Sequence, residues 1–204
     1  MNLKEKYIDL LINIGFSKEE IQQHWVGFEF NYSNKSRFYH NLKHIQEMVA
    51  CYETHRHALQ FPHEVLYSIF YHDYIYVSSQ KDNELKSAEY AIKILPKTTS
   101  INSSLVFDMI CATQKHQHNQ LEDINWLIDF DLKILAKDWE DYKIYFAQIR
   151  QEYGQYPEII YKEGRAKALK HFLEYEFIFQ TELFRKQFEE KARANIEREI
   201  LLLQ

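Results

Sequence analysis

Residues 37–52 read RFYHNLKHIQEMVACY, and the order of apolar and polar positions in this stretch decides how the chain folds. Its apolar residues recur at three- and four-residue spacing: Leu42, Ile45, Met48 and Val49. This spacing places them on one face of a helix, so we predict a helix over about 39–52. Within it, His40 and His44 would project from the same side, one turn apart.

The same periodicity recurs outward from this stretch in both directions. We predict helices over about 3–14, 18–28, 63–74, 82–95, 103–113, 124–135 and 139–153, then two long segments over 161–203 with a bend near 179–181. Ser17 and Glu20 form the pattern of a capping box, Pro62 is placed to open a helix, and Asp82 can cap another. Residues 30–38 are polar and predicted to form a turn.

The composition supports an all-α protein. Only 4 glycines and 3 prolines occur among 204 residues, too few for the many turns of an all-β fold. No linker or repeat divides the chain, so we expect one helical bundle over 1–204. Its core, which contains the candidate site residues, would cover about 37–135. Additional helices would lie N-terminal to this core and over about 138–203.

Charge and cysteine content narrow the classes of partner and compartment. The formal net charge is −5, which disfavours nucleic acid as the main partner. The two cysteines, Cys51 and Cys111, make a disulfide framework improbable and favour a reducing, cytoplasmic location. We expect no signal peptide and no membrane span, because no run of 18 apolar residues occurs.

Three polar clusters interrupt the apolar helices. His40 and His44 form the first, the doublet His72-Asp73 the second, and Asp129 and Asp131, among Leu, Ile and Phe, the third. A carboxylate in apolar surroundings is costly unless it is paired or coordinated. The imidazoles of His44 and His72 with the carboxylates of Asp73 and Asp131 suit a divalent ion such as Mn²⁺, Fe²⁺, Co²⁺ or Ni²⁺. Zn²⁺ and Mg²⁺ are further candidates.

The ordered set resembles the HD superfamily of metal-dependent phosphohydrolases, an all-helical fold named for its His-Asp doublet. The string Tyr39-His40-Asn41-x-x-His44 also resembles a segment of the cyclic-nucleotide phosphodiesterases. The bacterial family of predicted HD-superfamily phosphohydrolases is similar over nearly the whole chain. The matching strings are Arg37-x-Tyr39-His40-Asn41-Leu42-x-His44-Ile45, Phe70-Tyr71-His72-Asp73 with Tyr76, Asp82-Asn83-Glu84-x-x-Ser87-Ala88, Ala112-Thr113-x-Lys115-His116, Asp129-x-Asp131-Leu132-x-Ile134-Leu135 and Glu190-x-Ala192-Arg193-x-Asn195. One departure is Ala136, where the family often has glycine.

The resemblance implies one metal ion held by His44, His72, Asp73 and Asp131. It selects Asp131 over Asp129. Side chains two residues apart on a helix point about 200° apart, so these two carboxylates cannot both face one site. Asp129 would then be a cap, a surface charge or a hydrogen-bond partner of a ligand. The metal would activate a water molecule to attack phosphorus.

A catalytic role for His40 is implied by the same resemblance, in which it gives a proton to the leaving oxygen. A hydrogen bond from His40 to a ligand carboxylate is the alternative. Lys115 could contact a substrate phosphate. Arg37 and Lys43 flank the first cluster and could pair with phosphate, although Lys43 is expected to face solvent.

Further polar residues have two interpretations each. His116 and His118 could hold a second metal ion, or cap a helix end where a positive charge is favoured. Asp82 and Glu84 could orient water or a second ion, or begin a helix. The three tyrosines Tyr71, Tyr74 and Tyr76 could line a nucleotide pocket, although aromatic residues at helical spacing usually belong to the core.

Three functions compete at this point. The first is hydrolysis of a phosphoester in a nucleotide or another small phosphorylated metabolite. The second is an HD-fold sensor that binds metal or nucleotide without turnover. The third is a di-iron HD-type oxygenase, which needs additional histidine ligands. The substrate, the number of ions and the oligomeric state stay open, and the C-terminal helix could pack on its own core or on a second copy in a homodimer.

Overall fold

The computed structural model describes residues 2–204, and within that range it contains helices and no strand. The predicted all-α class is therefore confirmed. The α-helices are α1 Leu3–Asn13, α2 Lys18–Tyr32, α3 Leu42–His55, α4 Pro62–Tyr71, α5 Asn83–Lys93, α6 Ser103–Ala112, α7 Glu122–Leu132, α8 Trp139–Glu152, α9 Glu158–Glu174 and α10 Glu182–Leu203. Two 3-10 helices follow α3 and α7, over Arg56–Ala58 and Lys133–Ala136.

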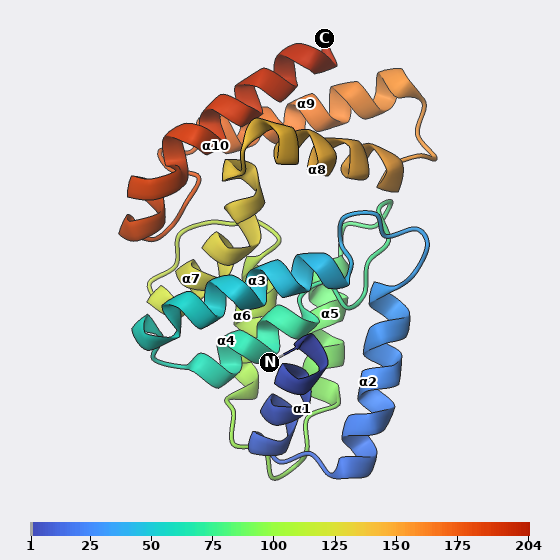
Figure 1. Cartoon of the computed structure of the whole chain (residues 1–204), viewed down its shortest axis with the longest axis vertical. Helices are drawn as coiled ribbons and strands as arrows, with labels where there is room; N and C mark the ends of the chain where they lie inside the picture. The colour runs from blue at the N-terminus through green and yellow to red at the C-terminus, as the bar shows by residue number, and fades with distance from the viewer. Residues whose placement is uncertain (1) are drawn as a thin grey trace.

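The helices form two groups along the long axis of the molecule (Figure 1). Helices α1 to α7 make up the larger group, with α3, α4, α6 and α7 crowded at its centre. Helices α8, α9 and α10 lie together at the other end, where the C-terminus lies. Buried apolar side chains from both groups belong to one continuous cluster that runs from Tyr7 to Leu203.

Local sequence explains the first helices. Helix α1 begins with a capping box of Asn2 and Glu5, and α2 begins with the predicted box of Ser17 and Glu20. Between them Gly15 has a φ of 103°, a left-handed conformation that glycine adopts without a steric penalty. Pro62 occupies the first turn of α4, as predicted, where its missing N–H costs nothing.

The boundaries around the polar clusters differ from the prediction. Helix α3 begins at Leu42 rather than near residue 39, because the side chain of Asn41 accepts a hydrogen bond from Lys43 N at 2.8 Å and acts as N-cap. His40 therefore precedes the helix, and the prediction that it shares a helical face with His44 is wrong. Helix α2 continues to Tyr32, so residues 30–32 are helical rather than part of a turn.

The doublet also lies outside the helix that precedes it. Helix α4 ends at Tyr71, and His72 is its C-cap. The ring Nδ1 of His72 is 3.0 Å from the carbonyl oxygen of Ile69, one of the carbonyls that a helix end leaves without an amide donor. This contact occupies a carbonyl at the end of the helix, and Nε2, on the opposite side of the ring, faces His44.

Two other expectations concern cysteines and membranes. Cys51 and Cys111 are both free thiols in this structure. Among the helices of residues 2–204, none combines the length and the apolar character needed to cross a bilayer.

Candidate metal centre

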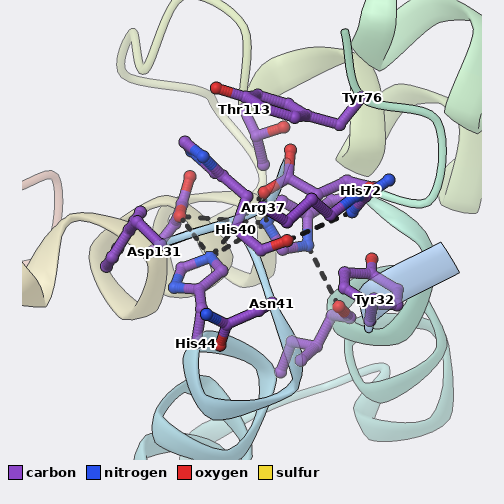
Figure 2. A network of polar contacts seen from close by, with 12 residues as sticks. Tyr32, Arg37, His40, Asn41, His44, His72, Tyr76, Thr113 and Asp131 are labelled. Carbon is purple, nitrogen blue, oxygen red and sulfur yellow. Dashed lines mark hydrogen bonds and ion pairs between the residues drawn. The ribbon is translucent and has the colours of Figure 1, made fainter. Parts of the chain in front are cut away.

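Three elements bring the predicted ligands to one point (Figure 2). His44 comes from the first turn of α3, His72 and Asp73 from the end of α4, and Asp131 from the last turn of α7. The two imidazole Nε2 atoms of His44 and His72 are 3.3 Å apart. Among residues 2–204, the geometry of a metal-binding group is met by His44, His72 and Asp131, whose donor atoms all lie within 4.8 Å of one another.

Both carboxylates contact both imidazoles. Asp73 Oδ2 lies 3.0 Å from His72 Nε2 and 3.8 Å from His44 Nε2. Asp131 Oδ1 lies 3.2 Å from His44 Nε2 and 3.8 Å from His72 Nε2. The structure therefore gathers all four residues that the sequence predicted as ligands, although His44 and Asp131 are 87 positions apart in the sequence.

The donor atoms of this cluster suit a divalent ion. The Nδ1 of His72 faces a carbonyl oxygen, which can only accept, so Nδ1 carries a proton and Nε2, on the opposite side of the ring, faces the cluster. Both imidazoles are buried, at 3% exposure for His44 and 1% for His72. Two buried nitrogens and two carboxylate oxygens at such short spacing need a shared positive charge, and this mixed set fits a transition ion.

The electrostatics agree with this requirement. Burial by itself lowers the pKa of His72, but the adjacent Asp73 carboxylate outweighs burial and raises that pKa to about 9. Burial raises the pKa of Asp73, yet His72 and His40 outweigh it and hold the pKa below its usual value. The pKa of Asp131 is also well below normal, because hydrogen bonds from His116 and His44 outweigh its burial. Both carboxylates are thus ionised at neutral pH.

Arg37 holds the backbone around the centre in place. Its guanidinium donates to the carbonyl oxygens of Asp73 at 2.6 Å, Tyr74 at 2.8 Å and His40 at 3.2 Å. The side chain is buried and packs over the ring of Tyr32. Since these donors are directed at carbonyl groups, Arg37 joins the segment before α3 to the segment after α4 instead of reaching a phosphate. Lys43 is exposed, as predicted.

A second group of polar contacts centres on Glu152, the last residue of α8. Its Oε2 lies 2.6 Å from His40 Nδ1 and accepts a hydrogen bond from Tyr76 Oη at 2.9 Å. Its Oε1 accepts from the backbone N–H of Tyr39 and of His40, at 2.7 and 2.9 Å. Burial by itself lowers the pKa of His40, but Glu152 outweighs it and raises that pKa above the ordinary value.

Glu152 was missed from the sequence, although a signal was present. The buried positions of α8 are Tyr142, Tyr145, Ile149 and Glu152, at spacings of three, four and three residues. A glutamate on the apolar face of a helix requires a partner. That partner is His40, and it lies 112 positions earlier in the chain, so the pairing has no local signature.

The residues considered for a second metal ion or for substrate do not lie together. His116 lies in the loop after α6, and its Nε2 is 3.1 Å from Asp131 Oδ2, so it contacts a ligand carboxylate from outside the cluster. His118 is exposed and lines a neighbouring groove rather than the centre. Lys115 is exposed and lines the cleft. The histidines that a second ion would need are thus not brought together here.

Asp82 and Glu84 lie in different surroundings. Asp82 occupies the N-cap position of α5 but makes no capping hydrogen bond, and pairs with Lys86 at 3.0 Å. Asp82 therefore begins the helix as predicted, but its side chain does not cap it, and the neighbouring Asn83 binds the backbone of residues 77–80 with its side chain. Glu84 does line the cleft, and burial raises its pKa.

Asp129 and Asp131 point to different parts of the molecule, as their spacing predicted. Asp129 is completely buried and accepts hydrogen bonds from the backbone N–H groups of Gln180 and Thr181, at 2.6 and 2.8 Å, and from Thr181 Oγ1 at 2.6 Å. Since Thr181 is the N-cap of α10, Asp129 anchors the start of that helix. It is not a surface charge.

The centre opens into a cleft of about 510 Å³. Its walls carry two ligands and most of the other polar candidates: His40, Asp73, Tyr76, Gln80, Lys81, Asn83, Glu84, Thr113, Gln114, Lys115, His116, Asp131 and Tyr153. Of the three tyrosines considered for a nucleotide pocket, Tyr71 and Tyr74 are buried in the core and Tyr76 lines the cleft, stacked on His40 at 4.3 Å. A pocket made of all three does not form.

No family model, curated protein or solved structure matches this chain.

Proposed function

We propose that this chain is a metal-dependent phosphohydrolase of the HD type, which cleaves a phosphoester of a nucleotide or another small phosphorylated metabolite. One observation carries the proposal. Two imidazole Nε2 atoms, 3.3 Å apart, are flanked by the carboxylates of Asp73 and Asp131, and these two carboxylates line a cleft that also contains His40. Metal ligands and a proton donor beside one cavity are the parts that phosphoester hydrolysis requires.

His44, His72, Asp73 and Asp131 would hold one divalent ion, for which Mn, Fe, Co, Ni, Zn and Mg are the candidates. When bound, such an ion supplies a Lewis acid for a phosphoryl oxygen and lowers the pKa of water. The protein prepares the site by keeping both carboxylates ionised and by fixing the ring of His72 through Ile69.

His40 is the proposed proton donor to the leaving oxygen. Its Nδ1 is engaged by Glu152, so the proton available to a substrate is the one on Nε2. The Glu152 carboxylate favours the protonated imidazole and holds its ring, which Tyr76 also covers on one face. Glu152 is therefore a positioning residue, and Lys115 at the cleft wall supplies a positive charge for the phosphate.

The test begins with metal content, measured by elemental analysis on protein purified without a histidine tag. We expect about one equivalent of metal in the wild type, its loss in His72→Ala, and its retention in His57→Ala, a matched change of an exposed histidine. Hydrolysis of an aryl phosphodiester and of a nucleotide panel is then measured with each ion.

Two results would contradict the proposal. Equal metal content in the wild type and in His72→Ala would show that the doublet is not the site. Metal and nucleotide binding without turnover of any substrate in the panel would instead favour the sensor that binds without hydrolysis.

A further inference from the structure

A second groove, of about 400 Å³, adjoins the metal cleft, and His116 lines both. It lies between the loop that follows α6 and the segment that joins α9 to α10. We call it the aromatic groove, and its relevant wall residues are His116, Tyr175, Phe177, Gln180 and Arg185. The groove and the cleft therefore adjoin at His116.

His116 connects the groove to the metal ligands through a strained backbone. Its φ is 51°, in the left-handed region that residues other than glycine seldom adopt. Its side-chain Nε2 lies 3.1 Å from Asp131 Oδ2, while its carbonyl oxygen accepts a hydrogen bond from Gln180 Nε2 at 3.1 Å. Such strain persists where the surroundings hold a residue firmly, and it is concentrated at functional sites.

The flat walls of the groove are held in place before any ligand binds. The guanidinium of Arg185 lies 4.3 Å over the ring of Phe177, and it donates to the carbonyl oxygens of Phe179 at 2.8 Å and Gln180 at 2.9 Å. Tyr175 Oη lies 2.8 Å from His171 Nε2. Phe177 is nevertheless 37% exposed. Fixed aromatic surfaces favour a planar ligand, because little conformational entropy is lost on binding.

Gln180 adds a hydrogen-bond acceptor to these walls. The side chain is only 6% exposed, and its Nε2 donates to the carbonyl oxygens of His116 and Ile178, at 3.1 and 2.9 Å. These two bonds fix the amide orientation and use both of its hydrogens. Within residues 2–204 its Oε1 accepts no hydrogen bond, so an acceptor of fixed direction is left for a ligand that donates.

We propose that the aromatic groove binds a planar ring bearing an amino group, as in an aminated purine, while the phosphate of the same molecule lies in the metal cleft. The ring stacks on the exposed ring of Phe177, and its amino group donates to Gln180 Oε1. This inference rests on the proposed function and deepens it, since it makes a nucleotide the substrate class.

Three probes test it by calorimetric titration: adenosine 5′-monophosphate, purine riboside 5′-monophosphate, which lacks the amino group, and ribose 5-phosphate, which lacks the ring. The wild type should bind the adenosine nucleotide at least about tenfold more tightly than ribose 5-phosphate, within the range that one stacked base contributes. Phe177→Ala should remove most of that ratio without changing the binding of ribose 5-phosphate.

Two more variants sharpen the test. Gln180→Met should abolish the preference for the amino-bearing purine over purine riboside monophosphate, expected at about tenfold in the wild type. Phe30→Ala, on a side chain 74% exposed on α2, is the matched control and should bind all three probes as the wild type does. Circular dichroism checks that each variant is folded.

The outcomes separate this inference from the proposed reaction. If the substrate panel shows no metal-dependent hydrolysis but Phe177→Ala still removes the ratio, the groove inference stands and the reaction is wrong. If metal-dependent hydrolysis persists while the wild type and Phe177→Ala bind the adenosine nucleotide equally, the groove inference alone is overturned. No measurable binding of the adenosine nucleotide at millimolar concentration would also overturn it.

Discussion

His40 Nδ1 and Glu152 Oε2 lie 2.6 Å apart, although 112 positions separate the two residues in the chain. Glu152 is 5% exposed and also accepts hydrogen bonds from the backbone N–H groups of Tyr39 and His40. This one carboxylate therefore joins the end of α8 to the segment that precedes α3, and it orients the proposed proton donor at the wall of the metal cleft.

Replacing Glu152 by Gln should lower the pKa of His40, because the amide removes the negative charge that stabilises the imidazolium. Measured by NMR titration of the histidine ring protons, the pKa of His40 should fall in Glu152→Gln relative to the wild type. Turnover of a phosphoester should fall while KM changes little, as expected for a positioning residue. An unchanged His40 pKa would contradict the role given to Glu152.

The same pair predicts how stability depends on pH, for protein kept metal-free with a chelator. The folded pKa of Glu152 is lowered from 4.5, so its contribution is present above pH 4.5 and is lost as the pH falls through the folded value. The pKa of His40 is raised from 6.5, so its contribution is present below pH 6.5 and is lost as the pH rises.

The stability difference between wild type and Glu152→Gln should therefore be largest between pH 4.5 and 6.5. We expect about 1–3 kcal/mol there, the range for a charge-assisted hydrogen bond. Urea unfolding at a series of pH values measures it. A difference that stays constant from pH 3 to pH 9 would contradict the ion pair.

Asp129 and Asp131 provide a matched pair on one helix. Asp131→Asn should weaken metal binding by more than about 100-fold, beyond the usual effect of losing a hydrogen-bond partner of a ligand. Asp129→Asn should keep the metal and lose about 1–3 kcal/mol of stability, because an amide cannot accept all the hydrogen bonds at Gln180 and Thr181. Elemental analysis and urea unfolding of both variants measure these two effects. Metal loss in Asp129→Asn with metal retained in Asp131→Asn would contradict the assignment.

Arg37→Lys tests whether the guanidinium sets the position of the ligands. A lysine ammonium cannot reproduce the planar fork that bridges the carbonyls of Asp73, Tyr74 and His40. We expect a lower Tm and metal affinity reduced by about tenfold. Arg56→Lys, on an exposed residue, is the control and should change neither quantity. Wild-type metal affinity in Arg37→Lys would refute the positioning role.

Metal should stabilise the folded chain. At a free concentration of 100 times Kd, a ligand that binds only the native state contributes about 2.7 kcal/mol. For a chain of 204 residues this corresponds to a rise in Tm of about 5–10 °C. Thermal unfolding with and without the ion measures the shift, and His72→Ala should show none. A rise of equal size in that variant would place the stabilising ion elsewhere.

Helical periodicity, capping patterns and the scarcity of glycine and proline were enough to predict the all-α class and the approximate extent of most helices. The boundaries at the polar clusters were less predictable. At residue 41 the side chain of Asn41 competes with helix formation, and at residue 72 the ring of His72 takes a helix-end carbonyl. Both are single hydrogen bonds that average periodicity does not detect.

The sequence by itself determined which residue types are available for metal chemistry and which helix faces are buried, because both depend on local identity and spacing. Only the tertiary structure decided that Glu152 pairs with His40, that Arg37 serves carbonyl groups, and that His118 lies away from the centre. Hydrogen-bond and ion-pair energies depend on distances of a few ångströms between atoms. For residues far apart in the chain, those distances follow from how the helices pack, which no local pattern encodes.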